Sequence, residues 1–286
     1  VSWTRGVNAW FVKNRGLALA ITLLGTGVTA ALLPSFATWL IEHYGWRFAF
    51  VGIALLPLAI GLPVAYLMFR EPEDTDGMHH VAAANRTGVS VRTALRDYRF
   101  WVIAVSVLCV SIGVGGSITN FQPLLIDRGF EPQDAAKFAG VIGVSIIVGR
   151  LVAGFLIDRF CAPLVTLPML ALPAVACLLL AKADVPAGAA ILSALLIGLA
   201  AGAETDLVAF LTARYFGLAH YGRLYGLQYA VFGFASGISP FIFGRVFDHY
   251  GTYRPILFAA AILFVVGATA LLTLGRYPVH TAAPED

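Results

Sequence analysis

The sequence predicts an all-helical protein that crosses a lipid bilayer several times, and two observations lead to this prediction. First, 59% of the 286 residues are hydrophobic and only 12% are charged, whereas a soluble domain carries roughly 25% charged residues. Second, the 14 prolines and 29 glycines lie mostly within apolar stretches, as they do in membrane helices. This composition excludes a soluble enzyme, a disordered chain and a secreted scaffold built on disulfides.

Eight apolar stretches are long enough to span a membrane, since a bilayer core about 30 Å thick takes about 20 residues of helix. Short polar segments separate them, and one longer polar segment, residues 70–97, indicates a linker between two groups of helices. The eight predicted spans are residues 17–41, 48–69, 100–126, 134–157, 162–182, 186–213, 224–247 and 255–275.

The distribution of basic residues predicts the orientation of these spans, because cytoplasmic loops carry an excess of Lys and Arg. One side holds residues 1–16, the 70–97 linker, Arg99, Arg159, the 214–223 loop and the C-terminus, and it carries 12 of the 19 Lys and Arg residues. The opposite side carries six, and the remaining one, Arg150, lies inside a span. We therefore expect the linker and the C-terminus to lie in the cytoplasm.

Two segments of the chain, residues 16–45 and 222–251, match at a constant offset of 206 positions. Six predicted spans separate them, so the two copies have the same orientation, as in the parallel repeats of transporters. The offset leads us to expect roughly one hundred further residues, three helices and most of a fourth, before Val1. The matched residues are Gly16 and Gly222, Gly27 and Gly233, Pro34 and Pro240, and His43-Tyr44-Gly45 and His249-Tyr250-Gly251.

Residues 149–159 read GRLVAGFLIDR, which resembles the G-x-L-x-D-R signature of the major facilitator superfamily at its second occurrence, between helices eight and nine. The stretch from Gly202 to Gly226 looks like the oxalate/formate antiporter and monocarboxylate-transporter-like branch of that superfamily. So does NRGLALAITLLGTG, followed by Pro34 and Gly45-Trp46-Arg47. The resemblance implies a major facilitator fold, with about eight transmembrane helices present, helices 5–12 of 12.

The resemblance and the repeat together divide the chain into three expected parts. Residues 1–69 form an incomplete N-terminal bundle with the end of helix 4 and helices 5 and 6. Residues 70–97 form the cytoplasmic linker, and residues 98–286 form a C-terminal bundle of six helices. The helices expected before Val1 would complete the first bundle.

Arg150 is the candidate substrate-binding residue. It lies eight residues before Asp158, about 12 Å along a helix, which places it near the bilayer midplane. A central arginine costs about 2.5–3.5 kcal/mol on insertion scales, so it needs an anionic partner. The resemblance implies that this arginine binds a carboxylate substrate; the alternative is a fixed salt bridge with Glu204 or Asp206. Monocarboxylate transporters carry an aspartate where Ile146 stands, so proton coupling through that pair is not supported.

Glu204 and Asp206 precede Arg214 by ten and eight residues, roughly 12–15 Å inside the membrane. Two positions correspond to about 200° of helix rotation, so the two carboxylates cannot face the same cavity. Asp206 shares a stripe with Gly198 and Gly202, which we expect to be the packing side, and this favours a structural or gating role. Glu204 either carries a coupling proton or relays charge to cytoplasmic arginines.

Three glycines, Gly113, Gly115 and Gly116, should loosen the span at 100–126. Asn120 and Gln122 lie just beyond them, where their side chains either contact a ligand or form helix–helix hydrogen bonds. Asp158 and Arg159 are expected at the cytoplasmic membrane edge as members of a gate. The candidate coupling or gating residues are therefore Glu204, Asp206, Asp158, Arg159 and Arg214.

No motif for a cofactor, a metal or an enzymatic reaction is present in the sequence. There is no phosphate-binding loop for ATP, and the adjacent His79 and His80 alone do not make a metal site. Cys109, Cys161 and Cys177 show no metal spacing, and no basic tract suits nucleic acid. The chain therefore lacks the residue clusters of an integral-membrane enzyme.

We expect a secondary transporter, a symporter or antiporter, of a small organic anion such as a mono- or dicarboxylate. It would sit in a bacterial inner membrane and work by alternating access between two bundles. The alternatives are a transporter-like sensor without net transport and a facilitator of a non-anionic small molecule.

Overall fold

The computed structural model describes residues 43–68, 88–157, 159–160, 162–275 and 277–278, with a few positions between 18 and 41. Among these residues the regular structure is helical, and six helices are long and apolar enough to cross a membrane. The helices are α3 (Trp46–Leu56), η1 (Pro57–Gly61), α4 (Leu62–Met68), α6 (Val91–Arg96), α7 (Tyr98–Asp127), α8 (Pro132–Ile157), α9 (Ala162–Leu180), α10 (Ala187–Phe216), α11 (Tyr221–Tyr250), α12 (Arg254–Ala270) and η2 (Leu271–Leu274).

The predicted spans from 48 onward each correspond to a helix, with one local difference at the predicted 214–223 loop. There α10 continues to Phe216 and α11 already begins at Tyr221. Gly217, with φ of 75°, ends α10, because the left-handed region favours glycine. Most of the predicted span at 17–41, including Pro34, lies outside the residues that the structure describes. The superposition of the two repeats therefore stays a prediction.

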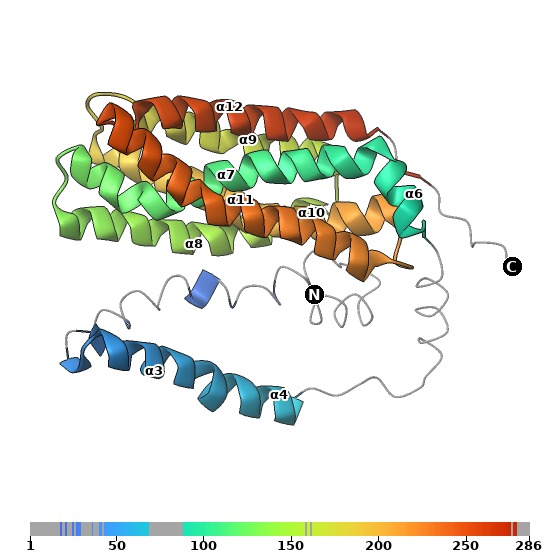
Figure 1. The fold of residues 1–286 in the computed structure, drawn as a ribbon, viewed down its shortest axis with the longest axis horizontal. Coiled ribbons are helices and arrows are strands. Elements are labelled where there is room, and N and C mark those ends of the chain that lie inside the picture. The colour runs from blue at the N-terminus through green and yellow to red at the C-terminus, as the bar shows by residue number, and fades with distance from the viewer. Residues whose placement is uncertain are drawn as a thin grey trace, which may run out of the picture.

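Helices α7 to α12 pack into one bundle (Figure 1). Helix α10 contacts α7, α8, α9 and α11, while α12 packs on α7 and α9. Helices α3 and α4, joined by η1, form a separate rod beside the bundle (Figure 1), with Tyr66 85% exposed. Helices α3 and α4 expose large apolar side chains along their length. Such a surface suits contact with lipid or with a further membrane helix.

Helix α7 is continuous from Tyr98 to Asp127, so the predicted loosening at its glycines is wrong. A Cβ on Gly113 would lie 2.6 Å from the ring of Phe264, and one on Gly116 would collide with Phe243. These glycines therefore allow α11 and α12 to approach α7 closely. The small residues of α7 thus serve tight packing in a continuous helix.

The residues just before α6 attach to the turn between α10 and α11. The Val89 N–H donates to the Phe216 carbonyl at 3.0 Å, and Gly88 forms an isolated β-bridge with Gly217. A Cβ on Gly88 would lie 2.8 Å from the Phe216 oxygen, so glycine is required there. The last part of the predicted linker thus packs on the α7–α12 bundle.

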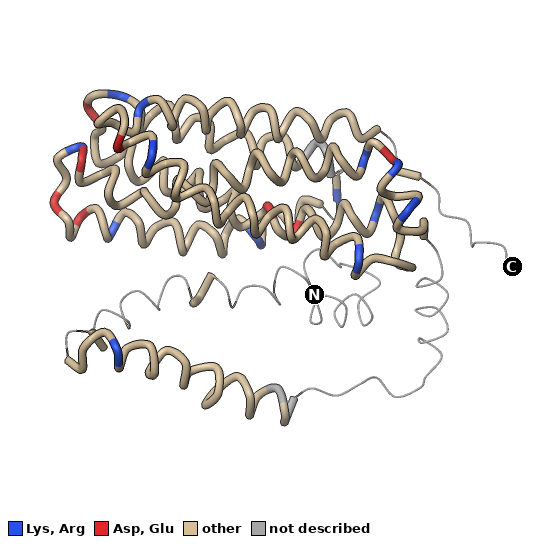
Figure 2. The backbone as a smooth tube through the Cα atoms, in the orientation of Figure 1, with Lys and Arg blue, Asp and Glu red and all other residues tan. Residues whose placement is uncertain are grey.

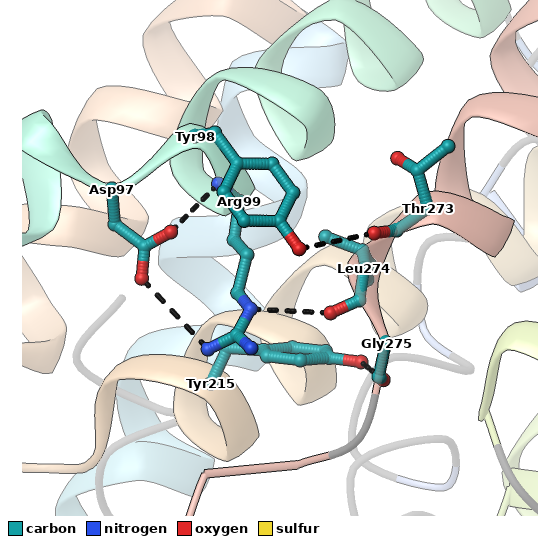
Figure 3. A network of polar contacts seen from close by, with 7 residues as sticks. All are labelled: Asp97, Tyr98, Arg99, Tyr215, Thr273, Leu274 and Gly275. Atoms are coloured by element: carbon teal, nitrogen blue, oxygen red, sulfur yellow. Dashed lines mark hydrogen bonds and ion pairs between the residues drawn. The ribbon is translucent and has the colours of Figure 1, made fainter.

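A polar network ties the end of η2 to the start of α7 and the end of α10 (Figure 3). Arg99 Nε donates to the Leu274 carbonyl at 3.1 Å, and the Tyr215 hydroxyl donates to the Gly275 carbonyl at 2.8 Å. Asp97 in turn accepts the Arg99 N–H at 2.9 Å and caps α7. The network supplies donors to carbonyls that a helix C-terminus leaves unsatisfied.

Candidate functional site

Helices α8 and α10 cross at very short range in the middle of the bundle. A Cβ on Gly149 would lie 2.5 Å from the Leu199 oxygen, and one on Gly198 would lie 2.6 Å from the Ile142 oxygen. A Cβ on Gly202 would collide with the Ile146 carbonyl. The predicted packing stripe of α10 is therefore confirmed, because only small residues let two helix backbones approach this closely.

This crossing brings Arg150 of α8 against Asp206 of α10. Arg150 Nη1 lies 3.0 Å from Asp206 Oδ1, and the two side chains are only 7% and 4% exposed. Arg150 Nε and Asp206 Oδ2 have no hydrogen-bond partner among the described residues. Of the two partners that the sequence left open for a salt bridge, the structure thus selects Asp206. The Nε–H of the guanidinium is therefore without an acceptor among the described residues.

Helix α11 contributes a tyrosine near this ion pair. Tyr225 is buried and lies close enough to Asp206 and Arg150 for electrostatic interaction with both. Its ring stacks on Tyr221 with centroids 5.4 Å apart and contacts Tyr229 at 5.9 Å. We did not identify Tyr225 from the sequence, although a tyrosine at every fourth position of a helix is a visible signal for one shared face.

Glu204 faces the opposite side of α10, toward α7, as the helix rotation predicts. Its carboxyl oxygen Oε1 accepts a hydrogen bond from the Ser111 hydroxyl, and both residues are buried. The structure describes no ion pair of Glu204 with an arginine, so the relay to cytoplasmic arginines has no contact to support it among the described residues. Ser111, which no sequence motif marks, is the partner that sequence reasoning missed.

Asn120 and Gln122 lie further along α7. Asn120 Nδ2 donates to the Gly116 carbonyl of its own helix at 3.0 Å, while Gln122 is half-buried. No hydrogen bond or ion pair joins either residue to Arg150 within the part of the chain that the structure describes. Their roles as substrate-binding residues stay predictions.

Charged residues gather mainly at the two ends of the bundle, with few in between (Figure 2). A sequence profile described as "Major Facilitator Superfamily" matches residues 2–240. The chain belongs to the Major Facilitator Superfamily. With its long apolar helices, this makes the chain part of a multi-pass integral membrane protein.

Curated proteins that are similar to this chain are named as transporters. "Monocarboxylate transporter 13" of Bos taurus is 25% identical over 98% of this chain and 65% of its own length. "Monocarboxylate transporter 12-B" of Danio rerio is 24% identical over 94% of the chain and 62% of its own length. The "Gentisate transporter" of Corynebacterium glutamicum is 26% identical over 47% of the chain. The chain thus spans a little under two thirds of the length of the first two.

A solved member of the superfamily shows the same fold. The crystal structure of the E. coli fucose:proton symporter matches 92% of this chain and 69% of its own, with a TM-score of 0.65 and 16% identity. This likeness shows the fold alone. The expected major facilitator fold is confirmed by both the profile and the structural match.

The superfamily signature segment ends at the turn between α8 and α9. Asp158, one of its predicted gate residues, lies outside the described residues. Arg159 is exposed, with its guanidinium 3.9 Å from the Phe155 ring centroid. Arg214 on α10 is also exposed and lies 5.0 Å from the Tyr277 ring centroid. The gating roles of these residues stay predictions.

The described residues of this superfamily member contain no group of three or more His, Cys, Asp or Glu side chains placed to hold a metal ion. Cys109 and Cys177 are buried free thiols. The histidine pair at 79 and 80 lies outside the described part of the chain.

Proposed function

We propose that the full-length protein is a secondary active transporter of a small organic anion, a mono- or dicarboxylate, that works by alternating access. The family and the names of the relatives support transport. Monocarboxylate and gentisate, which two of those names mention, are both carboxylate anions. The proposal rests above all on the buried Arg150, whose Nε–H has no acceptor among the described residues.

In this proposal Arg150 alternates between two anionic partners. An arginine presents a planar fork of N–H groups that matches a carboxylate through two parallel hydrogen bonds. Its contact to Asp206 uses Nη1 with a single oxygen, which is a weaker arrangement than a bidentate pair. A substrate carboxylate therefore competes with Asp206 for the guanidinium, and Tyr225 lies near enough to interact electrostatically with both residues.

The movement takes place between two bundles, each of which shifts largely as a rigid body. Residues 1–69 contribute to the first bundle, 70–97 form a cytoplasmic linker and 98–286 form the second bundle. The contacts among α7 to α12 hold the second bundle together, and single helices shift against one another within it during the movement. We propose a bacterial inner membrane as the location of the protein. The excess of Lys and Arg on one side supports a cytoplasmic linker and C-terminus.

A counterflow assay with the full-length protein in proteoliposomes tests this function. Vesicles loaded with unlabelled lactate, benzoate or succinate should accumulate the same labelled carboxylate from outside, and vesicles loaded with neutral glycerol should not accumulate labelled glycerol. Binding of a carboxylate without counterflow would indicate a sensor instead. Counterflow of glycerol alone would indicate a facilitator of non-anionic molecules.

A further inference from the structure

We propose that Glu204 is the site at which this protein binds the proton that it couples to anion transport. The inference rests on the proposed transport function and adds the coupling ion to it. The Glu204 carboxyl group binds the proton when the bundle is packed as in this structure, and it releases the proton when α10 and α7 separate.

The first support is that Glu204 lies in an apolar part of the bundle core. The Glu204 residue is 2% exposed, and its only described hydrogen bond comes from Ser111 of α7. Beside it lies a cavity of about 10 Å³, at the lower limit for one water molecule. Apolar side chains from α7, α9, α10 and η2 line it, among them Val110, Leu170, Leu207 and Leu271.

The second support is that no cation faces this carboxyl group within the described residues. Ser106 is the polar residue of α7 among those that line the cavity, and its hydroxyl donates to the Gly267 carbonyl. The titratable Cys109 of α7 and Cys177 of α9 are not among the cavity-lining residues, and Arg150 of α8 is paired with Asp206 on the other side of α10. Among the residues that the structure describes, Glu204 therefore has a hydroxyl partner and no counter-charge.

A carboxylate ion in such surroundings is very unfavourable, whereas the neutral acid needs only its hydrogen bonds. The packed conformation is therefore compatible with the protonated acid. The anion becomes stable once the helices move apart and water or a cation reaches it. Because proton affinity then differs between the two conformations, proton binding shifts the balance between them, as any ligand with unequal affinities does.

The third support is that α10 carries this carboxyl group and the substrate-linked ion pair only two positions apart. Glu204 faces α7 and Asp206 faces α8. A substrate that replaces Asp206 at Arg150 loosens α10 from α8, and a displacement of α10 also alters the packing around Glu204. One helix thus connects anion binding on one face with proton binding on the other. One proton moved with one monocarboxylate leaves the net charge of the transport step unchanged.

The test compares two modes of transport in proteoliposomes with the full-length Glu204→Gln variant, since glutamine resembles the protonated acid. We expect counterflow of lactate or succinate to stay within about twofold of wild type. Accumulation driven by a proton gradient, with the lower pH outside the vesicles, should fall about tenfold or more. The matched control is Thr212→Val on the same helix. Thr212 is buried, and its hydroxyl has no partner among the described residues, so this variant should keep both modes.

Accumulation by Glu204→Gln that follows the proton gradient as in wild type would overturn the proposal. If the variant is absent from the membrane, Glu204→Asp serves instead, since it keeps a titratable group; its uptake should remain coupled but shift in pH dependence. A wild-type protein without carboxylate counterflow would contradict the proposed function rather than the proton site.

A spectroscopic readout tests the site without any substrate. The infrared carbonyl-stretch band of a protonated carboxylic acid should appear in purified wild-type protein at neutral pH. It should be lost in Glu204→Gln and retained in Thr212→Val. A wild-type spectrum without a band that depends on Glu204 would overturn the proposal, whatever the transport assays show.

Discussion

Arg150 Nη1 and Asp206 Oδ1 lie 3.0 Å apart across the crossing of α8 and α10, in side chains that are almost fully buried. The two residues are 56 positions apart in the sequence, and the glycines of both helices allow them to meet. The pair gives the buried arginine a counter-charge from within the bundle. It also makes Arg150 and Asp206 the natural positions for substitution.

The first prediction concerns the charge and shape of Arg150. Arg150→Ala should reduce carboxylate uptake by about tenfold or more, because the anion loses its partner. Arg150→Lys keeps the charge but loses the planar fork, so uptake should fall less. The measurement is initial uptake at equal membrane expression, and Arg223→Ala, an exposed arginine on α11, is the control. Normal uptake by Arg150→Ala would show that the arginine is structural.

The second prediction concerns the stability of the ion pair. Asp206→Asn leaves a buried guanidinium without a counter-charge and should lower the free energy of unfolding by about 3–5 kcal/mol. The double variant Arg150→Met/Asp206→Leu removes both charges and should recover most of that loss while remaining inactive in uptake. Thermal unfolding of the purified protein in detergent measures both effects. An unchanged Tm in Asp206→Asn would mean that water solvates the pair.

The third prediction concerns the helix crossing that positions the pair. A Cβ on Gly202 would collide with the Ile146 carbonyl and lie 2.9 Å from Arg150 N, so Gly202→Leu should destabilise the protein by about 1–3 kcal/mol through overpacking. Gly244→Ala on α11 is the control, because no atom of the described residues lies within 4 Å of its Cβ position. It should be neutral or stabilising, since alanine favours a helix. Equal Tm values for the two variants would contradict the tight crossing.

The fourth prediction concerns orientation. A reporter fused within the 70–97 linker should give a cytoplasmic signal, and a reporter after Arg128, in the turn between α7 and α8, should give the opposite one. The physical reason is the retention of Lys and Arg on the cytoplasmic side during insertion. A non-cytoplasmic signal from the linker would invert the orientation of every helix.

Several features of this protein follow from the sequence by itself. Runs of apolar residues predicted helices from Tyr98 to Leu274 to within a few residues, because the bilayer thickness dictates helix length. The stripe of Gly198 and Gly202 identified the packing face of α10, since small side chains are what close helix contact requires. The position of Arg150 in the middle of an apolar span likewise implied an anionic partner, because an unpaired cation there is too costly.

Other features depended on the tertiary structure, because they join residues far apart in the chain. Sequence spacing showed that Glu204 and Asp206 face different ways, but only the rotation of α10 against α8 decided which of them pairs with Arg150. Ser111 and Glu204 are 93 positions apart, and nothing local marks a serine as the partner of a glutamate. The α7 glycines show the same limit: glycine is compatible with a loosened helix and with a tight contact, and only the neighbouring rings of Phe243 and Phe264 decide between them.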